Sequence, residues 1–147
     1  MVLGVARFCS RPRLTAAARA VTLLLDTHFL IWIVLRSKRL VEFPWLDRYR
    51  PWGVSPVSFL EIQFLAEIGR LSVRNPEFTN TVMSDPRFTV DDIPLATLVR
   101  HALRLDWTRD PFDRLLVAHS SARRVAFCTV DRGIRDHHRL LPPEIEK

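Results

Sequence analysis

The sequence predicts an α/β fold of three layers, in which helices cover both faces of a central parallel sheet of four to five strands. Short apolar runs with strand character alternate along the chain with segments of helical periodicity, an order typical of parallel sheets. The first run, residues 22–25, is almost entirely apolar, as expected for a strand buried on both faces. At 147 residues, the chain is long enough for one domain with a substantial core.

Each expected strand is short and is followed by a residue that ends it. "TLLL" leads into Asp26, "WGVSP" is stopped by Pro56, and "VAFCTV" is followed by Asp131. "RFTVDDI" has the alternating character of a half-buried strand. In chain order, the expected strands are residues 22–25, 52–56, 87–93 and 125–130.

The expected helices begin at residues suited to a helix N-terminus. Thr27 is the expected N-cap of the first helix and Ser58 of the third, with Gly69 as a stop signal for the latter. Pro94 opens a later helix, and Asp110 begins the last one. In chain order, the expected helices are residues 27–35, 38–47, 59–70, 76–84, 94–105 and 110–123.

The composition is that of a folded globular protein, with 48% hydrophobic and 26% charged residues. The longest apolar run, residues 29–35, is too short to span a bilayer, so we expect no membrane anchor. The two cysteines, Cys9 and Cys128, match no metal-ligand spacing and form no disulfide framework. We therefore expect a protein of the reducing cytoplasm.

The net charge of +6 is concentrated at the N-terminus, because residues 1–20 contain four arginines and no acid. This segment has three readings: an organellar presequence, a tail that contacts nucleic acid, or sequence upstream of the true start. We favour the last, since the first convincing element begins at "VTLLLDTH" and valine can be encoded by an alternative start codon. The expected organisation is a basic extension over residues 1–20, either disordered or upstream of the true start, and one domain over residues 21–147.

Two aspartates end strands that we expect to be buried. Asp26 follows "TLLL", and Asp131 follows "VAFCTV". Ligands of parallel α/β sheets gather at the carboxyl ends of the strands, so both residues are well placed for chemistry. Taken alone, either aspartate has a simpler explanation as a turn-forming residue.

Glu61 shares a helix face with apolar residues. Phe64, Leu65 and Ile68 lie three, four and seven positions further on, so the spacing predicts that Glu61 points into the core. A buried carboxylate is costly unless it is paired or bound to a metal. The simpler alternative is a salt bridge to an inward-pointing arginine.

The stretch "RDPFD" contains two carboxylates that we expect to differ in role. Asp110 suits the N-cap, with Pro111 at the first helical position. Asp113 suits the first turn, where the helix dipole favours an acid, but it also lies at the edge of the apolar arc, near the expected strand-end acids. Asp113 is therefore a candidate for the same site.

If these four acids meet, their repulsion must be balanced. Two carboxylates ~5 Å apart at an effective dielectric constant of ~20 repel by roughly 3 kcal/mol. Either some of the acids are protonated or a divalent cation lies between them. A set of oxygen ligands without Cys or His selects Mg²⁺ or Mn²⁺, which serve phosphoryl chemistry.

Four segments in this order and spacing resemble the PIN-domain ribonucleases, and most nearly the VapC-type toxins of bacterial toxin–antitoxin pairs. They are "LLLDTHFLIW", "VSFLEIQFLAEIGRL", "RDPFDRLLVAHS" and "TVDRGI", and the resemblance covers residues 22 to about 140. It implies a Mg²⁺- or Mn²⁺-dependent endoribonuclease, a hydrolase of RNA phosphodiesters. The catalytic and metal-binding acids of the family correspond to Asp26, Glu61, Asp113 and Asp131.

The resemblance also assigns supporting roles. Thr129 matches a hydroxyl that helps to orient the acids or the attacking water, and Asp110 belongs to the motif as a weaker site candidate. Arg109, Arg114 and Arg132 are candidates for gripping RNA phosphates beside the site. The implied partners are an RNA substrate, a cognate antitoxin protein, and a second copy of the chain or a toxin–antitoxin hetero-oligomer.

The family pattern also implies where the antitoxin binds. "FLIWIVL" is apolar nearly all round and "VEFPW" follows closely, so we expect an exposed apolar groove. The residues expected in this groove are Ile31, Trp32, Leu35, Phe43 and Trp45.

The chain departs from the family pattern at His119, where small or amide side chains are usual. His119 shares a face with Phe112 and Leu115, so we expect a core histidine and not a metal ligand. His137 and His138 are expected at the surface.

Other classes of protein fit the sequence less well. A PIN-like binding module without strong activity would normally have lost some of the acids, and none is missing. A phosphoacceptor receiver domain needs an acid pair and a lysine after its last strand, but the only lysines are Lys38 and Lys147. A flap-type DNA nuclease needs a longer chain, and a non-catalytic basic RNA-binding protein leaves Glu61 unexplained.

Overall fold

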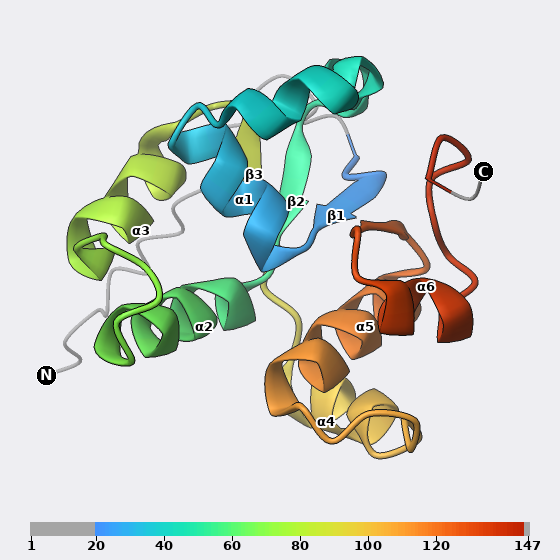
Figure 1. The fold of residues 1–147 in the computed structure, drawn as a ribbon. Helices are drawn as coiled ribbons and strands as arrows, with labels where there is room; N and C mark the ends of the chain where they lie inside the picture. The colour runs from blue at the N-terminus through green and yellow to red at the C-terminus, as the bar shows by residue number, and fades with distance from the viewer. Residues whose placement is uncertain (1–19, 146–147) are drawn as a thin grey trace, which may run out of the picture.

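The computed structural model describes residues 20–145, so residues 1–19, which make up nearly all of the basic extension, lie outside the described part. Four parallel strands form one sheet in the order β3-β2-β1-β4 (Figure 1). The strands are β1 (Leu23–Leu25), β2 (Trp52–Val54), β3 (Phe88–Val90) and β4 (Ala126–Cys128). The prediction of a parallel α/β sheet is thereby confirmed.

Six α-helices and two 3₁₀ helices connect these strands in the described residues. The 3₁₀ helices η1 (Lys38–Glu42) and η2 (Pro44–Tyr49) follow the first α-helix. The α-helices are α1 (Thr27–Val34), α2 (Pro56–Glu67), α3 (Asn75–Ser84), α4 (Leu95–Ala102), α5 (Pro111–Arg123) and α6 (Arg132–His137).

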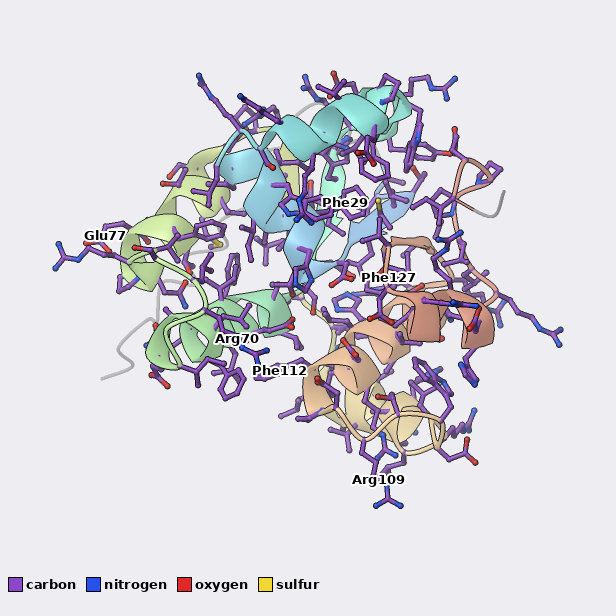
Figure 2. The ribbon with its side chains drawn as sticks, viewed as in Figure 1. Phe29, Arg70, Glu77, Arg109, Phe112 and Phe127 are labelled. Atoms are coloured by element: carbon purple, nitrogen blue, oxygen red, sulfur yellow. The ribbon has the colours of Figure 1, made fainter. Side chains whose placement is uncertain are left out.

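Alternating side chains of β1 pack into two different cores, one on each face of the sheet. Leu23 and Leu25 join α1, α2 and α3 in the larger core, which includes Phe29. Leu24 points to the other face and packs with Phe127 and residues of α5 and α6 (Figure 2). Both faces are therefore covered by helices, which gives the predicted three layers.

Gly53 allows β1 and β2 to lie close together. A Cβ atom at this position would lie 2.5 Å from the Val21 side chain and 3.1 Å from the carbonyl oxygen of Leu23. A side chain here would therefore push apart the two strands that pair at Leu24 and Gly53.

Two predicted helix starts are wrong. The N-cap of α1 is Asp26, and Thr27 is the first helical residue. The N-cap of α2 is Ser55, whose hydroxyl accepts a hydrogen bond from the amide of Val57, and Ser58 lies inside the helix. The error at α2 has a physical cause, because Pro56 ends β2 and also opens the helix, where its missing N–H costs nothing.

Three further elements differ from the sequence prediction. The helix expected at 38–47 is two 3₁₀ helices, because Pro44 interrupts it. α4 ends at Ala102 and not at residue 105. α6 was not expected at all, because Gly133 was read as a turn signal, whereas Asp131 caps a helix through the amide of Ile134.

His119 is a buried residue of α5, as expected from the sequence, and it joins three elements. Its Nδ1 lies 2.9 Å from the Ser55 hydroxyl at the start of α2, and its Nε2 lies 2.7 Å from Asp91, just after β3. Arg123, one turn further along α5, donates to the same Asp91 oxygen at 2.8 Å. The imidazole thus ties the carboxyl ends of β2 and β3 to α5.

The prediction that both His137 and His138 lie at the surface is wrong for His138. Its Nε2 lies 2.9 Å from the Ser120 hydroxyl, and its ring makes an edge contact with Phe127. The chain after α6 returns to the sheet, and the amide of Phe127 donates to the carbonyl of Leu140. His137 stays exposed, as expected.

We predict that His119→Ala lowers the free energy of unfolding by about 2–4 kcal/mol. The substitution leaves a cavity and removes a partner from both Ser55 and Asp91. Urea unfolding at neutral pH measures the effect. The control is His137→Ala, an exposed histidine that bonds to the Gly133 carbonyl and stacks on Trp107, which should lower stability by less than about 1.5 kcal/mol. Equal unfolding midpoints for the two variants would contradict the prediction.

Candidate active site

Asp26 and Asp131 lie at the same edge of the sheet and are linked by Thr129. Leu25 pairs with Cys128 in the parallel register, so the residues after β1 and β4 emerge side by side. The Thr129 hydroxyl donates to Asp26 Oδ2 at 2.6 Å and accepts from the amide of Asp131 at 3.0 Å. Thr129 therefore fixes the orientation of the buried Asp26 carboxylate relative to Asp131.

Asp131 has two tasks that use different oxygens. Its Oδ1 accepts the amide of Ile134 at 2.9 Å and caps α6. Among the described residues, Oδ2 takes part in no hydrogen bond that the structure records, so it is open to a ligand. The cap holds the carboxylate at the edge of the sheet without a side-chain partner of opposite charge.

Glu61 is buried, and a hydroxyl holds it in place. The Thr27 side chain donates to Glu61 Oε2 at 2.5 Å and lies 3.0 Å from the hydroxyl of Ser58. Because Thr27 follows Asp26 directly, the first turn of α1 connects the two carboxylates. An inward salt bridge, the simpler alternative from the sequence, is not formed within the described residues.

The predicted apolar face around Glu61 is not buried in the C-terminal half of α2, so this part of the prediction is wrong. The buried side chains of α2 are Ser58, Glu61 and Ile62. Phe64 and Ile68 are 45% and 47% exposed, because the C-terminal half of α2 extends beyond the sheet (Figure 1).

Asp110 and Asp113 lie at the start of α5, across from α2. The Asp110 carboxylate accepts hydrogen bonds from the amides of Phe112 at 2.8 Å and Asp113 at 3.2 Å, which confirms the predicted N-cap. The rings of Phe64 and Phe112 lie 5.5 Å apart and bridge the two helices. Asp113 lies in the first turn of α5, and its side chain is half-buried.

The pKa values show that the four carboxylates interact. Burial, followed by the charges of four acids, raises the pKa of Asp113 to about 7; those acids are Asp110, Asp26, Asp131 and Glu61. Burial also raises the pKa of Asp26, against the hydrogen bond from Thr129. Burial raises the pKa of Glu61 as well, and the Asp26 charge adds to this. The site therefore holds more negative charge than its surroundings balance.

The donor set fits a hard divalent cation held partly by water. Oxygen atoms of carboxylates surround the site, and no cysteine or histidine is needed as a ligand. Within residues 20–145, no three His, Cys, Asp or Glu side chains lie close enough together to hold a metal ion. Mg²⁺ commonly binds through one or two carboxylates and keeps several waters, so this arrangement suits it.

The sequence analysis missed the roles of two hydroxyl residues. The sequence predicts that Thr27 and Ser58 are helix caps, whereas Thr27 bonds to Glu61 and Ser58 bonds to Thr27. A small hydroxyl residue next to a strand-end aspartate is the one sequence signal that could have indicated such a role for Thr27.

The three arginines predicted to bind RNA have different surroundings. Arg109 projects away from the sheet (Figure 2). Arg114 donates to the carbonyl of Thr108 at 3.1 Å, and exposed Arg132 lies 4.0 Å from Asp136. Only Arg132 is adjacent in sequence to one of the strand-end acids.

The apolar groove predicted around α1 is largely filled by its own side chains. Ile31 is buried, and Phe29, Trp32 and Phe43 pack against one another with ring centroids 4.9–6.2 Å apart. Of the five residues predicted to line the groove, only Leu35 is widely exposed.

None of the helices in the described range is long and apolar enough to span a membrane.

Comparisons with known proteins agree with this fold. The family model of the PIN domain matches residues 23–140. The crystal structure of VapBC2 from Rickettsia felis, bound to a DNA fragment from its promoter, contains a similar chain with a TM-score of 0.59 and 14% sequence identity. The match covers 82% of this chain and 96% of that one. No curated protein matches the chain in sequence.

We predict that Asp113→Asn stabilises the metal-free protein at high pH. The pKa of Asp113 is about 7 when folded and near 3.8 when unfolded, so its contribution to stability is fully present below pH ~4 and is lost as the pH rises through ~7. After allowance for its partial exposure, we expect Asp113→Asn to be more stable than the wild type by about 1–2 kcal/mol at pH 8.

Denaturant unfolding in EDTA at pH 4 and pH 8 measures this difference. The control is Asp106→Asn, which removes an exposed carboxylate outside the cluster and should have little effect at either pH. The prediction is contradicted if the free energies of unfolding of Asp113→Asn and the wild type differ by the same amount at pH 4 and at pH 8.

Proposed function

This chain belongs to the PIN domain family, and from that premise we propose that it is a divalent-metal-dependent endoribonuclease, the VapC-type toxin of a toxin–antitoxin pair. The observation that carries the proposal is the geometry of the acids at one edge of the sheet, where Thr129 links Asp26 to Asp131 and Thr27 holds Glu61. Burial, followed by the charges of the neighbouring acids, raises the pKa of Asp113 to about 7, in agreement with this arrangement. Such a cluster is well suited to binding Mg²⁺ or Mn²⁺.

Each acid has a distinct task in this proposal. Asp26 and Glu61, held by Thr129 and Thr27, are the fixed ligands, because their hydrogen bonds set their rotamers before any ion binds. Asp113, whose pKa is raised to about 7 by burial and by the neighbouring acids, is partly protonated near neutral pH, and metal binding would displace this proton. Asp131 uses one oxygen for its helix cap and offers the other.

Asp26, Glu61, Asp113 and Asp131 would hold the divalent cation, which would supply an activated water and stabilise the charge that develops on the phosphate. A carboxylate of this cluster would accept the proton of the attacking water. Arg109, Arg114 and Arg132 are proposed contacts to the phosphates of the RNA substrate. The proposed location is the cytoplasm, where this substrate is found.

A protein partner is supported by apolar surface on two helices. Leu60, Phe64 and Ile68 form one exposed row on α2, and α4 carries a second row. The second row consists of Leu95, Val99 and Leu103. Rows of this kind are typical of protein interfaces, so we propose that they contact an antitoxin or a second copy of the chain. An antitoxin that presents a basic side chain to the acids would inhibit the enzyme without refolding it.

The alternative function is a PIN-like module that binds RNA or protein with weak catalysis. Catalysis is favoured because Asp26 and Glu61 are buried with partners that orient them and not with cations that neutralise them. A binding module has no need to retain such a costly arrangement.

We predict that the purified protein cleaves RNA only when Mg²⁺ or Mn²⁺ is present. The carboxylate cluster repels phosphate when no cation is bound. A labelled RNA incubated in EDTA should stay intact, and excess Mg²⁺ should restore cleavage. Ca²⁺ is the matched control, since it occupies oxygen sites but supports this chemistry poorly. Cleavage that persists in EDTA would exclude the proposed mechanism.

We predict that substitution of Asp110 mainly lowers stability, whereas substitution of Asp113 mainly lowers activity. Asp110→Ala should lower stability by about 0.5–2 kcal/mol through loss of the cap, while the folded fraction keeps most of its activity. Asp113→Asn should abolish cleavage at unchanged fold, and combining it with Asp26→Asn should cost little more. Asp110→Asn is the control, because asparagine also caps helices. The assignment would be reversed if Asp110→Asn were inactive and Asp113→Asn active.

A further inference from the structure

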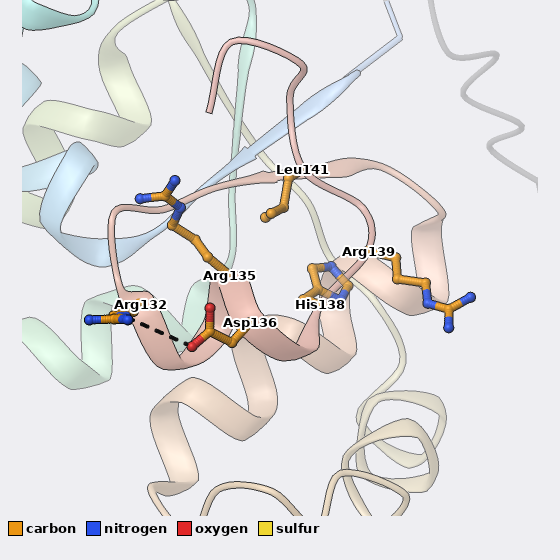
Figure 3. Close-up of a pocket in the computed structure, with 6 residues that line it drawn as sticks. All are labelled: Arg132, Arg135, Asp136, His138, Arg139 and Leu141. Carbon is orange, nitrogen blue, oxygen red and sulfur yellow. Dashed lines mark ion pairs between the residues drawn. The ribbon is translucent and has the colours of Figure 1, made fainter. Parts of the chain in front are cut away.

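A pocket of about 590 Å³ is lined by residues of α6 and of the segment that follows it. All of these residues come after Asp131 in the sequence. Its lining is strongly basic and contains one apolar side chain, Leu141. Three of its six lining residues are arginines (Figure 3). The lining residues are Arg132, Arg135, Asp136, His138, Arg139 and Leu141.

The arginines of this pocket are poorly neutralised. The only carboxylate in the lining is Asp136, which lies 4.0 Å from Arg132 in an exposed pair that contributes little. Arg135 donates to the carbonyl of Ile145, a neutral acceptor that leaves its charge unbalanced. Arg139 makes no hydrogen bond or ion pair that the structure records among the described residues.

Arginines elsewhere on the surface are often paired directly with acids. Arg87 contacts Asp85 at 2.7 Å, and Arg123 contacts Asp91 at 2.8 Å. Net positive charge collected in a hollow, without such partners, favours an anionic ligand.

The arrangement of the guanidinium groups favours a chain of phosphates over a single small anion. Figure 3 shows the three groups spread around the pocket and not directed at one point. The first of the three arginines, Arg132, directly follows Asp131 in the sequence. The carboxylate of Asp131 caps α6. A backbone that leaves the acidic cluster along α6 therefore meets the arginines in turn.

We propose that this pocket binds the sugar–phosphate backbone of single-stranded RNA, with Arg135 and Arg139 contacting phosphates outside the one that is cut. The proposal rests on the proposed function, since it places the pocket next to the cleavage site. The basic pocket offsets the repulsion between the acids and the RNA, so the substrate gains affinity away from the carboxylates. Arg132 lies between the two regions.

RNA binding without cleavage tests the pocket directly. A labelled, unstructured 15-nucleotide RNA is titrated with protein in EDTA, and fluorescence anisotropy gives the Kd at several salt concentrations. At ~0.1 M salt, each phosphate contact on a single strand contributes about fivefold to affinity, so Arg135→Gln/Arg139→Gln should weaken binding about 25-fold. The slope of log Kd against log salt should fall by about 1.4.

Two further variants keep the test decisive. Arg74→Gln/Arg100→Gln removes the same charge from exposed positions on α3's N-cap and on α4, and should leave the Kd within about twofold. Arg139→Gln alone removes no recorded contact, so it should fold normally and lose about fivefold in affinity. The proposal is overturned if the double variant binds as tightly as its control, if the wild type binds no RNA, or if duplex DNA binds with the same affinity and the same dependence on the two arginines.

Activity measurements separate this proposal from the proposed nuclease function. With Mg²⁺, the pocket variant should raise KM by a similar factor and leave kcat nearly unchanged. If the wild type cleaves RNA and the Arg135→Gln/Arg139→Gln variant has the same KM, the pocket proposal alone is overturned. If the wild type is inactive but binds RNA more tightly than this variant does, the nuclease proposal is overturned and the pocket remains an RNA-binding site.

Discussion

The parallel pairing of β1 with both of its neighbours is the constraint on which the rest of the structure depends. β1 lies between β2 and β4, and the amide of Asp26 extends the ladder by donating to the carbonyl of Cys128. Parallel strands deliver the residues that follow them to one edge of the sheet. Gly53 permits the close contact between β1 and β2. The register of β1 with β4, in which Leu25 pairs with Cys128, brings Asp26 next to the segment that carries Asp131.

Hydroxyl groups, and not cations, hold the acidic cluster together. Thr129 orients Asp26, and Thr27 orients Glu61, so each buried carboxylate has a neutral donor. Neutral donors satisfy the hydrogen bonds of the carboxylates but leave their charges unbalanced. Burial, followed by the charges of these neighbouring acids, raises the pKa of Asp113 to about 7. An arginine in place of Thr27 or Thr129 would have relieved this repulsion.

Negative and positive charge are therefore concentrated in two separate regions of the molecule. Negative charge is concentrated where the carboxyl ends of the strands meet, and uncompensated arginines line the pocket beside α6. α6 joins the two regions, since Asp131 caps the helix and Arg132 begins it. In the proposed function, the RNA backbone binds to the second region while one of its phosphates enters the first.

The sequence by itself determined the fold class, the four strands, the cap at Asp110 and the burial of Glu61, because these depend on local periodicity and capping chemistry. Only the tertiary structure decided what Glu61 contacts, that His138 is buried, and that α6 exists. Thr27 and Glu61 are far apart in sequence, and no local pattern encodes a hydrogen bond between them. The exposure of Phe64 also depends on where the sheet ends beneath α2, and sheet edges are set by long-range strand pairing.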